Sequence, residues 1–355
     1  MEKREKIESI KNMNRMQEKR ENPSTIYSAE NLTIGYQDGK KQFIVHKNLS
    51  LDIPSGQLIS LLGPNGAGKS TLLRTLSGAQ MPLGGMLTIG GKDLHTISAK
   101  KRSMIISVVL TDRTQIGGLT LYELVALGRQ PHTGFFGRLS KKDDAIIEQA
   151  LQDVGMTALK NRYVAQLSDG ERQKGMIAKA LVQESPLILL DEPTAFLDIV
   201  SRIEIISLLH QLAHKKNRTI LLSTHDIEQA LILSDQLWLL RPDKGLVCGT
   251  TEDILLNGDM DTLFDNKKIL FDTNHGTYYP RITHEKEISL RCENNILAHW
   301  TINALNRCGY RVNVNNEFLP MIIAEDKHHF KLKTAQQEWQ LTSFEELVKS
   351  IFILH

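Results

Sequence analysis

The sequence predicts an α/β fold with parallel strands, a helical subdomain and a small α+β domain near the C-terminus. Between residues 25 and 280, short apolar runs alternate with segments of helical periodicity, a pattern typical of parallel strands joined by helices. The stretch from about 112 to 170 has no strong strand pattern, which favours a helical subdomain there. Beyond Tyr279-Pro280, strand-like runs and two helical segments follow. Residues 281–355 are therefore predicted to form a separate domain.

The composition excludes several classes of function. Lys and Arg number 43 against 41 Asp and Glu, so the formal net charge of +2 produces no global field that would attract nucleic acid or a membrane surface. The three cysteines show no CxxC spacing, which favours a reducing cytoplasm over a disulfide scaffold or a zinc site. No apolar run approaches the ~18 residues that a membrane span requires. We therefore expect no nucleic-acid partner, and any membrane association should be peripheral.

Periodicity places the individual elements along the chain. Residues 1–24 mix charges of both signs with few large apolar side chains, and should form a frayed helix or a disordered extension. Strands are expected at Leu32–Tyr36, Phe43–Ile53, Leu58–Leu62, Met86–Ile89, Ser103–Leu110, Leu187–Leu190 and Thr219–Ser223. Helices are expected at Ser70–Ser77, Leu121–Leu127, Asp144–Val154, Gly170–Gln183, Val200–His214 and Ile227–Leu233. The tail should contain strands at Glu287–Arg291, Arg311–Val314, Met321–Ala324, Phe330–Leu332 and Trp339–Leu341, and helices at Ile296–Arg307 and Ser343–Phe352.

A glycine-rich loop lies between the apolar strand Leu58–Leu62 and the helix that follows it. It fits the pattern G-x(4)-G-K-[ST] and consists of Gly63, Pro64, Asn65, Gly66, Ala67, Gly68, Lys69, Ser70 and Thr71. Glycines allow successive backbone N–H groups to point inward and bind an anion, and the start of the helix adds its dipole. Lys69 can reach the β- and γ-phosphates of a nucleotide, and the Ser70 hydroxyl can ligate Mg²⁺. The loop therefore predicts ATP and Mg²⁺ as ligands.

Two adjacent carboxylates end the apolar run Leu187–Leu190. Asp191, at the end of this predicted strand, can hold the Mg²⁺ shell. Glu192, the next residue, can polarise an attacking water molecule. A hydrolytic base of this kind fits an ATPase better than a small-molecule kinase.

The segment between these two motifs resembles the signature motif of ABC transporter ATPases. It reads Leu167-Ser-Asp-Gly-Glu-Arg-Gln173, about twenty residues before the paired carboxylates. The same residues alone would also suit an ordinary helix N-cap, but their position favours the signature. The resemblance implies a P-loop ABC-type ATPase with a mixed β core and a helical subdomain. It also implies that Ser168, Asp169, Gly170 and Glu171 complete the site of a second copy, although Asp169 replaces the usual glycine.

Further ABC elements follow in the expected order. The resemblance implies that Asp198 lies in the D-loop near a dimer seam, that His225 senses the γ-phosphate, and that Tyr36 stacks on adenine. The Q-loop departs from the family pattern. Thr111 stands where glutamine is usual and would be the metal-contacting residue, with Gln115 as a possible substitute.

The segment Leu119–His132 indicates the class of transporter. With Gly137–Ser140 after it, this segment resembles ATPases that serve iron–siderophore, haem and vitamin B12 importers. A generic amphipathic helix would explain its apolar spacing but not Gly128-Arg129 together with Pro131-His132. The resemblance implies a partner permease, a substrate-binding protein acting through it, and a peripheral position on the cytoplasmic face of the inner (cell) membrane.

Other classes of ABC protein remain alternatives. A soluble ABC ATPase acting on DNA or ribosomes would usually carry long coiled coils or two cassettes, and this sequence has neither. The segment Val125–His132 argues against an exporter subunit. The presence of Glu192 and His225 argues against an inactive regulatory module. Residues 281–355 are expected to regulate or dimerise the ATPase, or else only to stabilise it.

Overall fold

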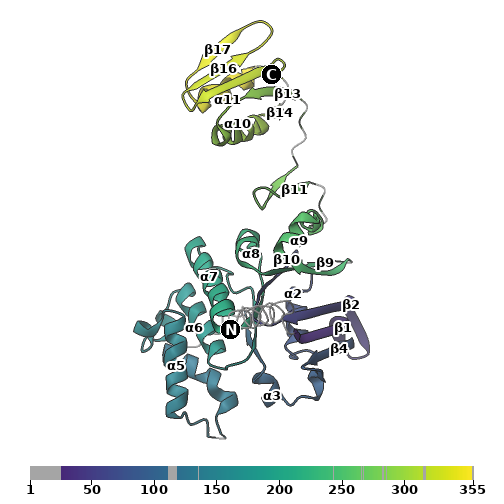
Figure 1. Cartoon of the computed structure of the whole chain (residues 1–355), viewed down its shortest axis with the longest axis vertical. Helices are drawn as coiled ribbons and strands as arrows, with labels where there is room; N and C mark the ends of the chain where they lie inside the picture. The colour runs from purple at the N-terminus through teal and green to yellow at the C-terminus, as the bar shows by residue number, and fades with distance from the viewer. Residues whose placement is uncertain are drawn as a thin grey trace, which may run out of the picture. The chain divides into compact units, whose positions relative to one another are not determined.

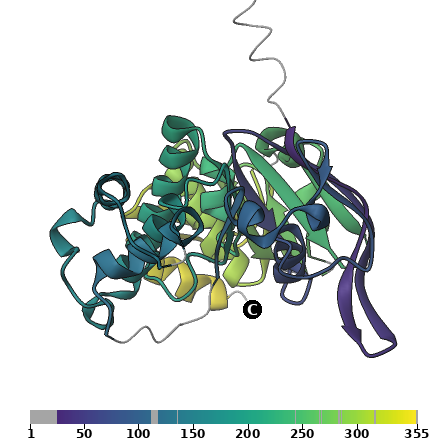
Figure 2. The same ribbon diagram turned by 90° about the horizontal axis from the view of Figure 1, so that it is seen from below.

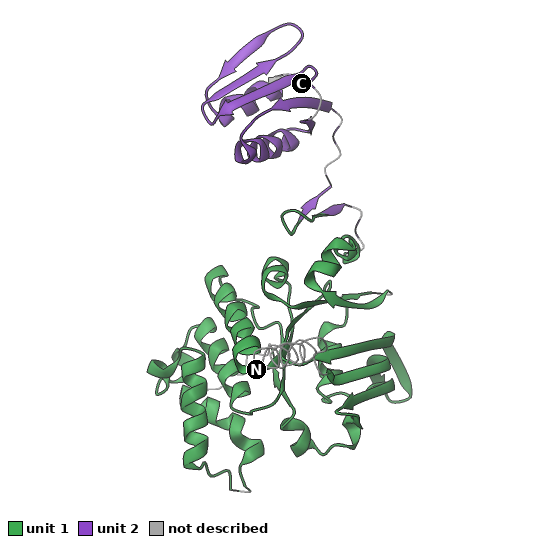
Figure 3. Ribbon diagram, viewed as in Figure 1, with its two compact units in different colours: residues 1–265, 271–277 green, residues 266–270, 278–355 purple. Residues whose placement is uncertain are grey.

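The computed structural model describes residues 25–110, 118–134, 136–242, 244–264, 266, 268–281, 284, 286–314 and 317–353. The chain divides into two compact units (Figure 3). The first comprises residues 1–265 and 271–277, and the second comprises residues 266–270 and 278–355. In the described part of the chain, every helix is too short or too polar to cross a bilayer.

An antiparallel sheet begins the first unit. Its strand order is β2-β1-β4-β5. The strands are β1 (Thr25–Asp38), β2 (Lys41–Pro54), β4 (Gly84–Ile89) and β5 (Lys92–Asp93). β1 and β2 form a long hairpin that turns at Gly39, whose φ of 58° suits glycine.

A six-stranded sheet forms the centre of the first unit. Its order is β10-β9-β3-β8-β7-β6, and all neighbours are parallel except β9 and β10. The strands are β3 (Leu58–Leu62), β6 (Ile106–Val109), β7 (Leu187–Asp191), β8 (Thr219–Ser223), β9 (Gln236–Arg241) and β10 (Gly245–Thr250). The predicted α/β class with a mixed β core is therefore confirmed. The strands β9 and β10 were not among the expected elements.

Both faces of the six-stranded sheet are covered. Successive residues of β7 point to opposite faces, as a strand requires. Leu187 and Leu189 enter a core shared with the antiparallel sheet and α2 (Lys69–Leu76). Ile188 and Leu190 enter a second core built with the helices that precede and follow β7. In Figure 2, helices α4 to α6 lie on one side of this unit and the β1–β2 hairpin lies on the other.

Helices fill the segment between β6 and β7. They are α4 (Leu121–Ala126), η2 (Leu127–His132), α5 (Lys141–Asp153), η3 (Thr157–Leu159), η4 (Val164–Gln166) and α6 (Asp169–Leu181). The three α-helices each begin with a capping box, formed by Thr120 with Glu123, Ser140 with Asp143, and Ser168 with Glu171. The first turn of α5 is polar and carries no apolar periodicity. The predicted start at Asp144 is therefore three residues later than the observed start at Lys141.

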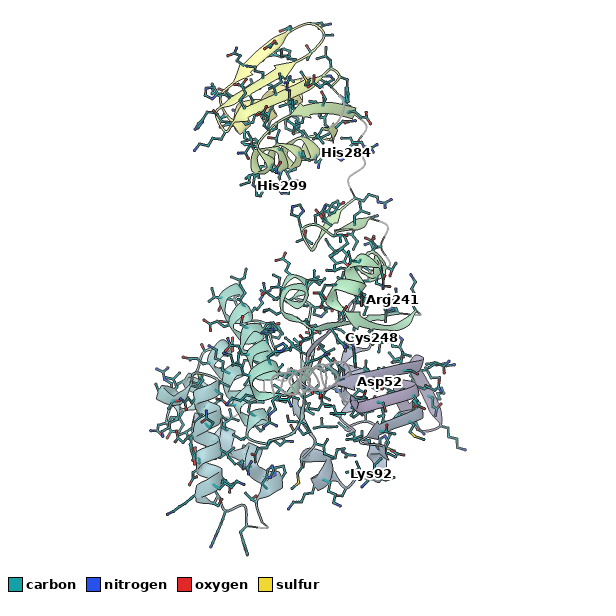
Figure 4. The ribbon with its side chains drawn as sticks, in the orientation of Figure 1. Asp52, Lys92, Arg241, Cys248, His284 and His299 are labelled. Atoms are coloured by element: carbon teal, nitrogen blue, oxygen red, sulfur yellow. The ribbon has the colours of Figure 1, made fainter. Side chains whose placement is uncertain are left out.

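The first unit contains further helices among its described residues, and Figure 1 labels several of them. They are η1 (Leu94–Thr96), α3 (Ala99–Ser103), α7 (Ile199–Lys216), α8 (Ile227–Leu233), α9 (Thr251–Leu256) and η5 (Asp259–Thr262). Strand β10 lies beside β2, where Cys248 and Asp52 are neighbours (Figure 4). No disulfide joins the three cysteines.

The second unit contains a small α+β domain, as its sequence predicts. Its sheet has the order β14-β13-β15-β16-β17, with β13 parallel to both neighbours. The elements are β13 (Lys286–Arg291), α10 (Asn295–Arg307), β14 (Tyr310–Asn313), β15 (Met321–Asp326), β16 (His329–Lys333), β17 (Glu338–Leu341) and α11 (Phe344–Ile353). Ile288, Phe330 and Leu332 pack with Leu305 and Leu347 of the helices in a separate core. A two-stranded sheet of β11 (Ile269–Asp272) and β12 (Thr277–Pro280) precedes this domain in the chain.

Candidate functional site

The glycine-rich loop joins the end of β3 to the start of α2. Gly66 and Gly68 have φ values of 78° and 91°, which L-residues rarely adopt. A side chain on Gly63 would lie 2.5 Å from the Leu240 carbonyl oxygen, so only glycine fits beside β9. These constraints explain the glycines at three of the motif positions.

A cavity of about 290 Å³ opens beside this loop. Its lining contains most of the residues predicted to bind ATP, together with Glu192 from the end of β7. The lining residues are Tyr36, Val45, Asn65, Gly66, Ala67, Gly68, Lys69, Ser70, Thr71 and Glu192. Backbone N–H groups at the start of a helix and one lysine suit a phosphate chain.

Lys69 lies at the centre of the polar contacts. Its Nζ donates to the carbonyl oxygens of Gly63 at 2.8 Å and Pro64 at 3.2 Å, and lies 3.4 Å from His225 Nε2. Burial lowers the pKa of Lys69, and the nearby carboxylates of Glu192 and Asp191 partly oppose that shift. The cavity therefore contains a cation that is removed from bulk water but close to two acids.

The two carboxylates are held by the neighbouring strand. Ser223 Oγ donates to Asp191 Oδ1 at 2.7 Å and accepts from the Glu192 N–H at 2.9 Å. Glu192 Oε1 lies 2.7 Å from His225 Nε2. Glu192 has a φ of 47°, a conformation that is uncommon for a residue with a side chain. Sequence reasoning identified both acids and His225, but it assigned no role to Ser223.

Two side chains from the antiparallel sheet contact the glycine-rich loop, residues 63–71, which we call the phosphate loop below. Tyr36 Oη lies 2.6 Å from Thr71 Oγ1, and its ring lines the cavity. His46 on β2 is buried, and its Nε2 donates to the Ala67 carbonyl oxygen at 2.8 Å. A lone histidine on an apolar strand is not a recognisable sequence signal, so His46 was missed.

The predicted signature residues 168–171, called the signature turn below, lie at the start of α6, and Asp198 lies at the start of α7. Ser168 caps α6, with its Oγ accepting from the Glu171 N–H at 3.2 Å, while the Glu171 carboxylate accepts from the Ser168 N–H at 2.8 Å. Asp198 caps α7, and hydrogen bonds from the Ser201 backbone and hydroxyl hold its pKa below the usual range. In the described chain, none of these residues lines the nucleotide cavity. Ser168, Asp169 and Asp198 are exposed, so another molecule can reach them.

The oxygen donors near the loop suit Mg²⁺. This ion binds through one or two protein oxygens together with phosphates and water, so it needs no complete protein cage. The Ser70 hydroxyl lines the cavity, and the Asp191 carboxylate lies close enough to Lys69 to act on its pKa, so both are donors of this type. Among the described residues, no group of three or more His, Cys, Asp or Glu is arranged to hold a metal. Thr111 and Gln115, the proposed Q-loop ligands, lie outside the described residues.

The segment Gly128–His132 has a packing role inside the helical subdomain. Arg129 is only 3% exposed, and its guanidinium contacts Asp143 Oδ1 at 2.8 Å, Glu184 Oε2 at 2.6 Å and the Val182 carbonyl oxygen at 2.6 Å. A side chain on Gly128 would lie 2.1 Å from the Lys179 carbonyl oxygen. His132 Nε2 donates to the Gln183 carbonyl oxygen at 2.8 Å. These residues attach η2 to the C-terminal end of α6.

Comparison with known proteins identifies the family. The family model "ABC transporter" matches residues 46–195, and the model "Iron ABC transporter C-terminal domain" matches residues 285–351. The iron(3+)-hydroxamate import ATP-binding protein FhuC of Bacillus subtilis is 36% identical over 266 residues, covering 74% of this chain and 97% of the relative. The chain belongs to the ATP-binding proteins of ABC transporters. It is therefore an ABC ATPase.

Further relatives and solved structures agree with this assignment. The ferric enterobactin transport ATP-binding protein FepC of Escherichia coli is 37% identical to this ABC ATPase, over 68% of this chain and 88% of the relative. A transporter assigned to the metal-chelate type, in an inward-facing conformation, has 29% identity and a TM-score of 0.60, over 72% of this chain and 96% of that chain. A dimeric ATP-binding cassette bound to ADP and Pi has 27% identity and a TM-score of 0.55, over 63% and 98%. The resemblance inferred from the motifs is confirmed.

Proposed function

We propose that this ABC ATPase powers the import of an iron–siderophore, haem or corrinoid through a partner permease. The observation that carries the proposal is its similarity to two iron-siderophore import proteins along nearly their whole length, combined with an iron ABC C-terminal domain. The chain would act on the cytoplasmic face of the cell membrane, bound to the permease. A substrate-binding protein would deliver the cargo from the other side.

The residues of the cavity would divide the work of hydrolysis. The loop N–H groups and Lys69 bind the β- and γ-phosphates, and Tyr36 stacks on the adenine ring. Ser70 and Asp191 would hold Mg²⁺, which when bound neutralises charge on the β- and γ-phosphate oxygens. Glu192 accepts a proton from the attacking water. His225 Nε2 lies 2.7 Å from the Glu192 carboxylate, which supports the proposal that His225 contacts the γ-phosphate.

The site is proposed to be completed by a second copy of the chain. Ser168, Gly170 and the start of α6 would contact the γ-phosphate held by the partner's loop. A side chain on Gly170 would lie 3.0 Å from Ser201 Oγ at the start of α7, so the signature turn packs beside the segment that Asp198 caps. Asp169 and Glu171 supply negative charge to the first turn of α6, where it stabilises the helix.

Co-purification and stimulated hydrolysis test the proposal. The full chain, expressed in its native host with an affinity tag, should co-purify with a permease of many membrane spans. In reconstituted vesicles, its ATPase rate should rise when a binding protein loaded with a ferric siderophore, haem or a corrinoid is added. Co-purification with ribosomes or DNA, with no permease present, would contradict the proposal and favour a soluble ABC ATPase.

A further inference from the structure

We propose that Ser223 is a positioning residue whose single hydroxyl orients both carboxylates of the hydrolytic site. The inference assumes the roles proposed above for Asp191 in Mg²⁺ binding and Glu192 in activating water. Ser223 itself would contact neither the nucleotide nor the metal. Its effect would pass entirely through its two hydrogen bonds.

The position of Ser223 in the sheet places its hydroxyl between the two acids. It is the last residue of β8 and pairs directly with Asp191 at the end of the parallel strand β7. Its side chain is fully buried. A hydroxyl has one hydrogen to donate and lone pairs to accept, and both capacities are used here. It donates to Asp191 Oδ1 at 2.7 Å and accepts from the Glu192 N–H at 2.9 Å.

The accepted hydrogen bond supports an unusual backbone conformation. Glu192 has a φ of 47°, which a residue with a side chain keeps only when the surrounding structure holds it. Its N–H points to Ser223, contacting the backbone oxygen at 3.2 Å as well as Oγ. This turn directs the Glu192 side chain towards His225 Nε2, 2.7 Å away. Without the hydroxyl, the Glu192 carboxylate would lose part of what fixes its direction.

The donated hydrogen bond acts on the metal ligand. It restricts rotation of the Asp191 carboxylate, which is itself largely buried. Residues that orient a metal ligand in this way typically contribute 10–100-fold to metal affinity or activity. Among the described residues, the side-chain hydrogen bonds of Ser223 go to Asp191 and Glu192, whereas Lys69 of the phosphate loop bonds to carbonyl oxygens of that loop. The two hydrogen bonds therefore predict a defect that is specific to Mg²⁺ and to hydrolysis.

Substitution of Ser223 tests the inference. Ser223→Ala should raise the Mg²⁺ concentration for half-maximal activity about tenfold and lower kcat by roughly 10–100-fold. Binding of a fluorescent ATP analogue in EDTA should remain within twofold of wild type, while the tightening of that binding by Mg²⁺ should be weakened. Ser223→Cys, of similar size but with a weak donor, should show the same pattern. Ser223→Thr, which keeps the hydroxyl, should restore most of the activity.

Ser60→Ala provides a matched control. Ser60 lies in β3, next to β8, and is equally buried, and its Oγ is hydrogen-bonded to Ser234 Oγ at 2.6 Å rather than to the acids. This variant should show wild-type Mg²⁺ dependence. All variants are compared by thermal melting, so that a loss of folding is recognised.

Three outcomes would overturn the inference. They are wild-type Mg²⁺ dependence and kcat in both Ser223→Ala and Ser223→Cys, an equal loss in Ser60→Ala, or weakened nucleotide binding already in EDTA. Glu192→Gln, measured in parallel, separates this result from the proposed function. If Glu192→Gln abolishes turnover while the Ser223 variants do not, the inference about Ser223 alone is wrong. If Glu192→Gln retains turnover, the assumed role of Glu192 is wrong.

Discussion

Two polar side chains from distant parts of the chain, Glu192 and His225, lie close to Lys69 of the phosphate loop. His225 Nε2 is 2.7 Å from the Glu192 carboxylate and 3.4 Å from the Lys69 ammonium. A γ-phosphate in the cavity would lie among a cation, an imidazole and a carboxylate. Such an arrangement has the charges needed to bind the phosphate and to accept a proton from an attacking water molecule.

Removal of the Glu192 carboxylate should stop hydrolysis without preventing binding. Glu192→Gln keeps the shape of the side chain but cannot accept a proton, so turnover should fall by about 10²–10⁴-fold. Equilibrium binding of Mg²⁺-ATP should be retained, and an ATP-bound dimer should accumulate in size-exclusion chromatography. Glu204→Gln, which only loses an exposed ion pair with Lys174, is the control. Turnover within twofold of wild type would remove Glu192 from its role.

At the scale of elements, η2 and α5 are attached to the signature helix by one buried arginine. Arg129 contacts Asp143 at the start of α5 and the Val182 carbonyl at the end of α6. α6 begins at the signature turn, so displacement of η2 would move the helix that carries Ser168.

Loss of this arginine should destabilise the subdomain. Arg129→Met leaves the largely buried Asp143 carboxylate without its guanidinium, which should lower the free energy of unfolding by about 3–5 kcal/mol. Lys160→Met is the control, since its ion pair with Glu148 is exposed and should contribute at most about 1 kcal/mol. Urea unfolding, followed by circular dichroism, measures both. Equal effects of the two substitutions would show that burial of the Arg129 pair is unimportant.

Asp143 should make stability depend on pH in the acid range. Hydrogen bonds from the Ser140 hydroxyl and backbone, with the Arg129 guanidinium, lower the pKa of Asp143 from 3.8 to about 2. A carboxyl whose pKa is lower in the folded state stabilises the fold above pH 3.8, and this contribution is lost as the pH falls towards 2. The destabilisation caused by Asp143→Asn should therefore be larger at pH 6 than at pH 3. Urea unfolding at the two pH values measures this destabilisation. If Asp143→Asn lowers the free energy of unfolding equally at pH 6 and pH 3, the lowered pKa of Asp143 is contradicted.

At the scale of the whole molecule, the signature residues do not line the nucleotide cavity among the described residues, which is what the proposed site shared by two copies would need. Each copy carries one phosphate loop, with Lys69 in the cavity, and one signature turn, where Ser168 caps α6. In the proposed dimer, the loop of one copy would face the turn of the other. Hydrolysis without the permease should therefore rise more steeply than linearly with protein concentration.

A mixture of two inactive variants tests this arrangement. Lys69→Ala and Ser168→Ala should each be nearly inactive alone. In a mixed dimer, the intact Lys69 of one copy faces the intact Ser168 of the other, so one working site is restored. The ATPase activity of the equimolar mixture measures the effect. The control is each variant alone at the same total protein concentration. No recovery despite confirmed mixed dimers would argue against a shared site.

The C-terminal domain has a hydrophobic core of its own, and the described residues that line the nucleotide cavity all belong to the first unit. A chain that ends at Pro280 should therefore bind ATP with wild-type affinity and hydrolyse it, with altered dimerisation or an altered response to the permease. The truncated and the full chain are compared by their nucleotide affinity, their basal turnover and their melting temperature. Lost nucleotide binding in a truncated chain that still melts cooperatively would place part of the site in the tail. If only the melting temperature changes, the domain stabilises rather than regulates.

The sequence by itself determined the family, the phosphate loop and the two acids. Each of these features is contiguous in the chain, and the requirements for glycine, lysine and paired carboxylates act over a few neighbouring residues. Short buried strands such as Leu187–Leu190 were also predictable, because turn signals and helices bound their apolar runs. The strand Gln236–Arg241 was missed because only two residues separate it from α8, so the apolar residues of the two elements follow each other closely. Periodicity alone does not separate a helix from a strand in such a run.

Only the tertiary structure decided which side chains support the site. Ser223 and Asp191 are 32 positions apart, His46 and Ala67 are 21 apart, and Arg129 and Val182 are 53 apart. Pairing of strands and packing of helices bring these groups within hydrogen-bond distance, and a single serine, histidine or arginine carries no local pattern that reveals its partner. Arg129 illustrates the difference. Its motif indicated the class of transporter, whereas its burial showed that the guanidinium binds the subdomain's own helices, because a buried charge is stable only beside carboxylates and carbonyls that satisfy it.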